Sequence, residues 1–228
     1  MARPARPPRY QACQILQAGP ALTRLVPFTV SGSGVKPGAV TDVPEEQPLP
    51  AAAVRRSWPE LLRPRLDIAW LPAGRVFLRV ATVPTNDPGN TPAMLELQLE
   101  KLSPLPVAQV VWTYEILPAA EAGHETTVVI VVCERPAVEA FLGRLEERGF
   151  MADRVELPAL HQLVATPMEA TGVYLFPIEG GPGRACLTAW SVEGRLRHVA
   201  FLRLPDGPQW PGTLAAELNT IAWSGELE

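Results

Sequence analysis

Residues 66–71 (LDIAWL) and 75–83 (RVFLRVATV) open the stretch that decides the fold, which runs from Leu66 to Ala165. Both runs are rich in apolar, β-branched and aromatic residues, as strands are. The intervening Pro72-Ala-Gly74 has the composition of a turn. The pattern therefore predicts a β-hairpin over residues 66–83.

A helix is predicted after this hairpin. Thr91 offers a hydroxyl for an N-cap, and Pro92 suits the first helical turn. Its apolar face is formed by leucines at helical spacing, Leu95, Leu99 and Leu102. Two β-rich runs follow, residues 109–117 and 126–133. The second contains the sequence Val-Val-Ile-Val-Val, which is typical of a strand buried on both faces at the centre of a sheet.

The next segment reads as helix, strand and helix. Pro136 begins a helix, and Gly149 stands where a left-handed C-terminal cap is wanted. Its apolar stripe is Val138, Phe141, Leu142 and Leu145. Residues 154–157 form a short strand, and Pro158 begins another helix. A buried strand, a crossover helix and a further strand predict a βαβ unit in a partly parallel sheet.

Before this block, residues 10–16 and 22–30 are predicted strands joined at Gly19-Pro20. Residues 31–50 are rich in Gly, Pro, Ser and Glu, which favours a long exposed loop. The sequence Gly32-Ser-Gly34-Val-Lys36 within it lacks the spacing of a phosphate-binding loop, so we interpret it as a connector. A short helix is predicted over residues 51–62, with Trp58 and Leu61 as its apolar anchors.

After the block, a second β-rich unit is predicted. Its strands are residues 173–178, 185–190 and 196–203, joined by turns at 179–183 and 193–194. A helix capped by Thr213 follows. Three strands and one helix are too few to close an α/β domain, so we expect this unit to be incomplete.

Composition narrows the function classes. The chain has 228 residues, 47% hydrophobic and 19% charged, which is ordinary for a folded protein. A net charge of -4 argues against a nucleic-acid or anionic-membrane surface, because such surfaces need basic patches. The three cysteines, Cys13, Cys133 and Cys186, are far apart and lie in apolar runs, which favours buried free thiols and a reducing compartment. We see no apolar run long enough to span a membrane and no secretory signal, so a cytoplasmic chain is expected.

Four segments carry a resemblance to a known family: MLELQLEKLSPLPV (94–107), VVWTY (110–114), VVIVVC (128–133) and AFLGRLEERGF (140–150). Together they resemble the actin-like cytoplasmic domains of the GspL and PilM type, the assembly-platform proteins of type II secretion and type IV pili. The resemblance covers roughly residues 66–205.

The resemblance implies an α/β, duplicated ribonuclease-H-like fold. Residues 1–65 and the core at 66–168 would form the first subdomain, and 169–228 the start of a truncated second one. It also implies a non-catalytic scaffold at the cytoplasmic face of the bacterial inner membrane. Its partners would be the assembly ATPase or inner-membrane platform proteins, and a homodimer is left open.

Nucleotide-binding relatives of this fold carry Asp-x-Gly turns that hold metal and phosphate. Here the matching turn is Gln17-Ala-Gly19, and a neutral amide lacks the charge that Mg²⁺ coordination favours. The second turn falls at Pro177-Ile-Glu179 or at Glu179-Gly180-Gly181, depending on register. We therefore expect no cofactor. An actin-like ATPase with divergent phosphate loops stays open as the alternative, as does an unrelated α/β module.

The sequence gives little support for a metal site, a nuclease or a serine hydrolase. The histidines, His124, His161 and His198, show no paired metal-ligand spacing. A two-metal nuclease would need converging carboxylates. Its candidates are Asp67, Glu96, Glu100 and Glu115. No serine lies in a Gly-x-Ser-x-Gly elbow.

Protein binding is the remaining class. The candidate contact residues are Trp70, Trp112 and Tyr114. They lie on predicted strands, where alternate side chains face inward, so a place in the core is the competing interpretation for each.

Overall fold

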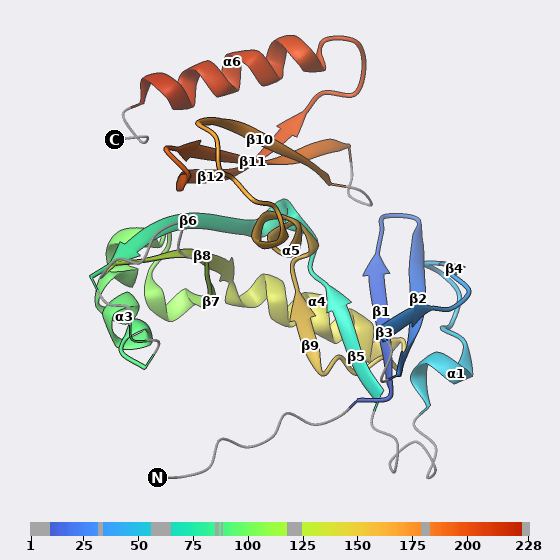
Figure 1. Cartoon of the computed structure of the whole chain (residues 1–228). Helices are drawn as coiled ribbons and strands as arrows, with labels where there is room; N and C mark the ends of the chain where they lie inside the picture. The colour runs from blue at the N-terminus through green and yellow to red at the C-terminus, as the bar shows by residue number, and fades with distance from the viewer. Residues whose placement is uncertain are drawn as a thin grey trace. The chain divides into compact units, whose positions relative to one another are not determined.

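The computed structural model describes residues 10–31, 34–55, 65–84, 87, 89–117, 125–178 and 183–224. The chain forms two compact units. Figure 1 labels their helices and strands. Unit 1 comprises Met1–Leu71 and Ala140–Glu156, and unit 2 comprises Pro72–Glu139 and Leu157–Glu228. These boundaries do not coincide with those predicted at 65/66 and 168/169, so the assignment to two ribonuclease-H-like subdomains stays a proposal.

Unit 1 is built on one mixed sheet in the order β3-β2-β1-β5-β9, with β4 also paired to β2. Its strands are β1 (Ala12–Ala18), β2 (Leu22–Ser31), β3 (Gly34–Pro37), β4 (Thr41–Pro44), β5 (Arg65–Trp70) and β9 (Arg154–Glu156). Strands β1 and β2 form the predicted antiparallel hairpin. Strand β5 lies parallel to β1 on one side and to β9 on the other.

The core of unit 1 lies between this sheet and its helices, α1 (Ala51–Val54) and α4 (Arg135–Glu147). Its buried members come from alternate strand positions and from one face of α4. They are Leu16, Leu25, Val43, Leu49, Ala53, Ala69, Phe141, Leu145 and Phe150. Gly149 ends α4 with a φ of 83°, as predicted for a left-handed cap.

Unit 2 contains two three-stranded antiparallel sheets, in the orders β6-β8-β7 and β10-β11-β12. The first consists of β6 (Val76–Val83), β7 (Val110–Ile116) and β8 (Thr126–Glu134), and the second of β10 (Gly172–Ile178), β11 (Arg184–Val192) and β12 (Arg195–Leu204). Its helices are α3 (Thr91–Leu102), α5 (Pro158–Ala165), α6 (Trp210–Trp223) and the short 3-10 turns Ala73–Arg75 and Val107–Gln109. Strand β8 is central and buried, as predicted.

Each sheet of unit 2 carries a helix on one face. Helix α3 buries Leu95 and Leu99 in a cluster with residues of β6, β7 and β8. Helix α6 buries Leu214 against Cys186 and Leu202 of the other sheet. Both helices begin earlier than predicted: Asn90, and not Thr91, precedes α3, and Gln209, and not Thr213, precedes α6. The proline in the first turn of each helix explains this start, because it needs no backbone donor.

The predicted hairpin over residues 66–83 is wrong. Strand β5 has β1 and β9 on its two sides, which leaves no free side for β6. Strand β6 instead pairs with β8 in unit 2. The turn composition at Pro72-Ala-Gly74 agrees with the 3-10 turn Ala73–Arg75 that separates the two strands, but a local turn does not determine which strand becomes the neighbour.

Two further predictions need correction. Strands β8 and β9 belong to different sheets, so the segment from 126 to 157 is no βαβ unit; the parallel pairing expected there is made by β1, β5 and β9. Residues 31–50 are no simple loop, because β3 and β4 both pair with β2 and Val43 joins the core. Of the helix predicted over 51–62, the described part is α1; Trp58 and Leu61 lie outside the described residues.

Candidate functional site

The first phosphate-loop position lies in a plain hairpin turn. Gln17 is on β1, and the amide of Gly19 donates to the carbonyl oxygen of Leu22 at 2.9 Å. The turn therefore uses this amide internally, and Gln17 brings no carboxylate. Glu179 and Gly180 of the second position lie outside the described residues. Lys36 lies on β3, in an antiparallel pair with Thr29, and not in a loop that could wrap phosphates.

The acidic candidates for metal binding do not converge. Asp67 is buried in unit 1 and forms an ion pair with Arg65, with 2.8 Å between Nε and Oδ1. Glu96 and Glu100 are exposed on α3, and Glu115 is exposed on β7 of unit 2. Among the residues that the structure describes, no three His, Cys, Asp or Glu side chains are placed to share a metal ion. His161 and His198 lie on α5 and β12, and His124 lies outside the described residues.

The cysteines are free thiols, as predicted, with Cys133 and Cys186 buried and Cys13 half-buried. Burial raises the pKa of the Cys133 thiol to about 11. The pKa of Cys13 and of Cys186 is raised as well, again mainly by burial. Since the thiolate is the nucleophilic form, these environments oppose sulfur chemistry near neutral pH.

Trp112 and Tyr114 lie together on β7, an edge strand of its sheet. Their ring centroids are 6.3 Å apart with 29° between the planes. Both are half-buried and pack against the α3 cluster. Ile116 continues the same face of the strand and is 36% exposed. We call Trp112, Tyr114 and Ile116 the aromatic ledge; its residues combine a share of the core with an accessible outer surface.

Trp70, the third aromatic candidate, belongs to unit 1, whereas the ledge belongs to unit 2. It lies on β5 in unit 1, in register with Gln17 on β1 and Glu156 on β9, and is half-buried. Two of the three aromatic candidates, Trp112 and Tyr114, are therefore neighbours on one strand.

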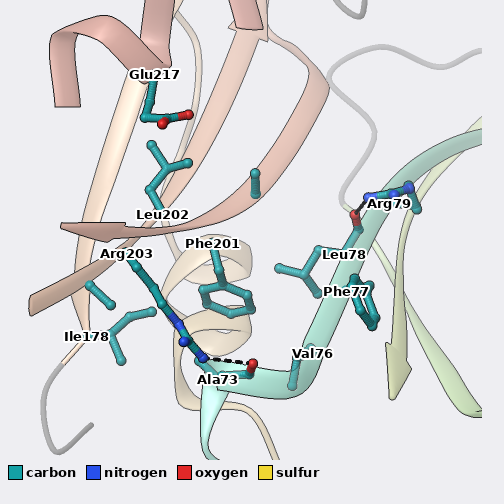
Figure 2. Close-up of a pocket in the computed structure, with 13 residues that line it drawn as sticks. Ala73, Val76, Phe77, Leu78, Arg79, Ile178, Phe201, Leu202, Arg203 and Glu217 are labelled. Atoms are coloured by element: carbon teal, nitrogen blue, oxygen red, sulfur yellow. Dashed lines mark hydrogen bonds between the residues drawn. The ribbon is translucent and has the colours of Figure 1, made fainter. Parts of the chain in front are cut away.

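A second feature of unit 2 is a cavity of about 470 Å³ beside the edge strands β6 and β12. We call it the edge slot. Its lining includes Val76–Arg79 of β6, Ala200–Arg203 of β12 and Glu217 of α6. Figure 2 shows the side chains of Leu78 and Phe201 in the space between the two strands.

Two arginines border the edge slot. The Nη2 of Arg203 donates to the carbonyl oxygen of Gly74 at 3.0 Å, which links β12 to the turn before β6 (Figure 2). The Nη1 of Arg79 donates to the carbonyl oxygen of Leu78 at 2.9 Å. This slot could not be predicted from the sequence, because the placement of β6 beside β12 depends on contacts between segments far apart in the chain.

No helix among the described residues is long and apolar enough to cross a membrane.

No protein-family model matches the chain, and no curated protein sequence matches it. Similar solved structures do exist. The chain matches the structure titled "PilM-PilN type IV pilus biogenesis complex" with 21% identity and a TM-score of 0.59, covering 97% of this chain and 67% of the other.

It also matches the cytoplasmic domain of EpsL, an inner-membrane component of the type II secretion system of Vibrio cholerae. That match has 18% identity and a TM-score of 0.52, and covers 95% of this chain and 79% of the other. Together with the mixed sheet of unit 1, these likenesses show that the chain has the actin-like α/β fold of PilM and of cytoplasmic EpsL.

Proposed function

We propose that this chain is a non-catalytic scaffold of a type II secretion or type IV pilus assembly platform, at the cytoplasmic face of the bacterial inner membrane. The observation that carries the proposal is a fold shared along nearly the whole chain with two proteins of such machines. A scaffold needs a contact surface and no reacting groups. The neutral Gln17 and the scattered carboxylates agree with that role.

The aromatic ledge is the surface that we assign to the partner. Aromatic side chains provide large contact areas at low entropic cost, and they are enriched among residues that dominate binding energies. Trp112 and Tyr114 are held by the α3 cluster, so their orientation is set before a partner arrives. The partner would be the assembly ATPase or an inner-membrane platform protein of the same machine.

Calorimetric titration with the purified ATPase and with the cytoplasmic segment of the inner-membrane protein tests the proposal. We expect the wild-type chain to bind one of them, and Tyr114→Lys or Ile116→Lys to weaken that binding by about tenfold or more, because a charge would be buried in an apolar contact. Thr113→Lys, on the opposite face of the same exposed strand, is the matched control. Absence of binding to both partners, or equal weakening by Thr113→Lys, would contradict the proposal.

The alternative is an actin-like protein that binds ATP through divergent loops. It requires Mg²⁺ and phosphates to be held without a carboxylate at position 17, where β1 carries Gln17. We therefore favour the scaffold. The melting temperature of the protein in the presence of ATP and Mg²⁺ distinguishes the two, because only an ATP-binding protein is stabilised.

A further inference from the structure

We propose that β7 pairs with β7 of a second copy of this chain, antiparallel and about a two-fold axis at Tyr114, so that the two β6-β8-β7 sheets join at their edges. The inference concerns the main-chain edge of β7. It does not rest on the proposed function, because a chain that stays monomeric could still bind a partner through the aromatic ledge.

The free edge of β7 provides the first argument. Within the described residues, β7 pairs with β8 alone, in one unbroken register. Leu117, directly after β7, donates its amide to the carbonyl oxygen of Thr127 on β8 at 3.0 Å. Because main-chain groups alternate in direction along an antiparallel strand, those of Trp112, Tyr114 and Ile116 point away from β8. These are the N–H and C=O groups that a further strand would use.

The side chains of this edge provide the second argument. Proteins commonly protect an edge strand from pairing with another chain by placing Lys, another charge or Pro on it. Strand β7 (VVWTYEI) contains no Lys, Arg or Pro, and its single charge is Glu115. Every other edge strand among the described residues has at least one Lys, Arg or Pro: Lys36 on β3, Pro44 on β4, Arg154 on β9, Arg79 on β6, Pro177 on β10 and Arg203 on β12.

Strand β7 is also complementary to itself, as a two-fold interface requires. With the axis at Tyr114, Trp112 lies opposite Ile116 of the second copy, and Tyr114 lies opposite its own counterpart. Cross-strand pairs of aromatic and β-branched side chains stabilise a sheet. On the other face of the strand, Glu115 lies opposite Thr113 of the second copy, so like charges do not meet.

The neighbouring registers are less favourable. An axis at Glu115 would place the two Glu115 carboxylates directly opposite each other, which is destabilising. An axis at Thr113 would need the outward carbonyl oxygen of Val110, to which Nη2 of Arg135 already donates at 3.0 Å. An axis between two residues would bring outward groups against groups that already bond to β8. The axis at Tyr114 avoids all three conflicts.

Sedimentation equilibrium of the intact chain at increasing concentration tests the inference. We expect the wild type to pass from monomer to dimer. Thr113→Glu places a second carboxylate opposite Glu115, whereas Thr113→Lys places a positive charge there. The dimer dissociation constant of Thr113→Glu should exceed that of Thr113→Lys by about tenfold, because two symmetry-related like-charge pairs replace two opposite-charge pairs.

The two variants are matched, because they alter one exposed residue on the strand face opposite the aromatic ledge. Melting temperatures verify that both variants fold. A wild type that stays monomeric at every concentration, or equal dissociation constants for the two variants, would overturn the inference. The measurement uses the chain alone, so its failure is distinguishable from a failure to bind the assembly ATPase or the inner-membrane protein.

Discussion

Asp67 shows how a residue with catalytic potential serves the fold instead. Its side chain is buried, and its two oxygens lie 2.8 Å from Nε and 3.2 Å from Nη2 of Arg65. The same guanidinium donates to the carbonyl oxygens of Ala52 and Ala53 in α1. The pair thus connects β5 to α1. The Asp67 carboxylate is already bound by Arg65 and therefore has a structural role.

We predict that Asp67→Asn lowers the free energy of unfolding by about 3 kcal/mol, because the buried Arg65 guanidinium loses its counter-charge. Urea unfolding, followed by circular dichroism, measures the change. The double variant Arg65→Met with Asp67→Asn should recover part of the loss, since no buried charge is then left alone. Equal stability of Asp67→Asn and the wild type would show that the pair contributes nothing.

Cys133 gives a prediction about pH. Burial raises the pKa of its thiol from 9.0 to about 11, so the unfolded chain loses this proton at a lower pH than the folded chain does. The contribution of the thiol to stability is therefore fully present below pH 9.0 and is lost as the pH rises towards about 11.

Unfolding free energies at about pH 8 and about pH 10.5 provide the test. The wild type should lose more stability between these two values than Cys133→Val, which has a similar volume and no titrating group. The same loss in both proteins would exclude Cys133 as its source.

At the scale of the element, the end of α4 is a well-defined helix stop. The amide of Phe150 donates to the carbonyl oxygen of Leu145 at 2.9 Å, and that of Gly149 donates to Glu146 at 2.8 Å. This pair of bonds requires a left-handed residue, and Gly149 has a φ of 83°. The stop directs the chain back into β9, and Phe150 enters the core of unit 1.

Two alanine substitutions, one at this stop and one inside α4, should have opposite effects. Gly149→Ala is predicted to lower the free energy of unfolding by about 1 kcal/mol, because a Cβ disfavours the left-handed conformation. Gly143→Ala, inside α4, should raise it by roughly 0.5 to 1 kcal/mol. An added Cβ at Gly143 would meet no atom within 4 Å. A stabilising Gly149→Ala would contradict the assigned geometry; both are measured by urea unfolding.

The elements show which structure could be predicted from sequence. The strand at 126–134 and the helices beginning near Pro92 and Pro136 are visible in local patterns of apolar residues and caps. Strands β3 and β4 were missed because they are short and contain Pro and Gly, and only their pairing with β2 makes them strands. Strand partners depend on contacts far apart in the chain, so the hairpin at 66–83 was wrong although both of its strands exist.

At the scale of the whole molecule, the two candidate sites also differ in how far local sequence patterns predict them. The aromatic ledge could be found in part, because large aromatic residues at alternate strand positions share a face. The edge slot could not, because it exists only when β6 and β12 are known to be sheet edges. The actin-like fold was predicted through the family resemblance and is confirmed by the PilM and EpsL structures.

The central claim, a scaffold that works without nucleotide, is tested most directly by melting the protein with increasing ATP and Mg²⁺. A ligand at 100 times its Kd stabilises the native state by about 2.7 kcal/mol, which shifts the melting temperature by several degrees. We predict a constant melting temperature up to about millimolar ATP, the concentration at which even a weak site would respond. A melting temperature that rises with ATP only when Mg²⁺ is present would contradict the account and favour an actin-like ATPase.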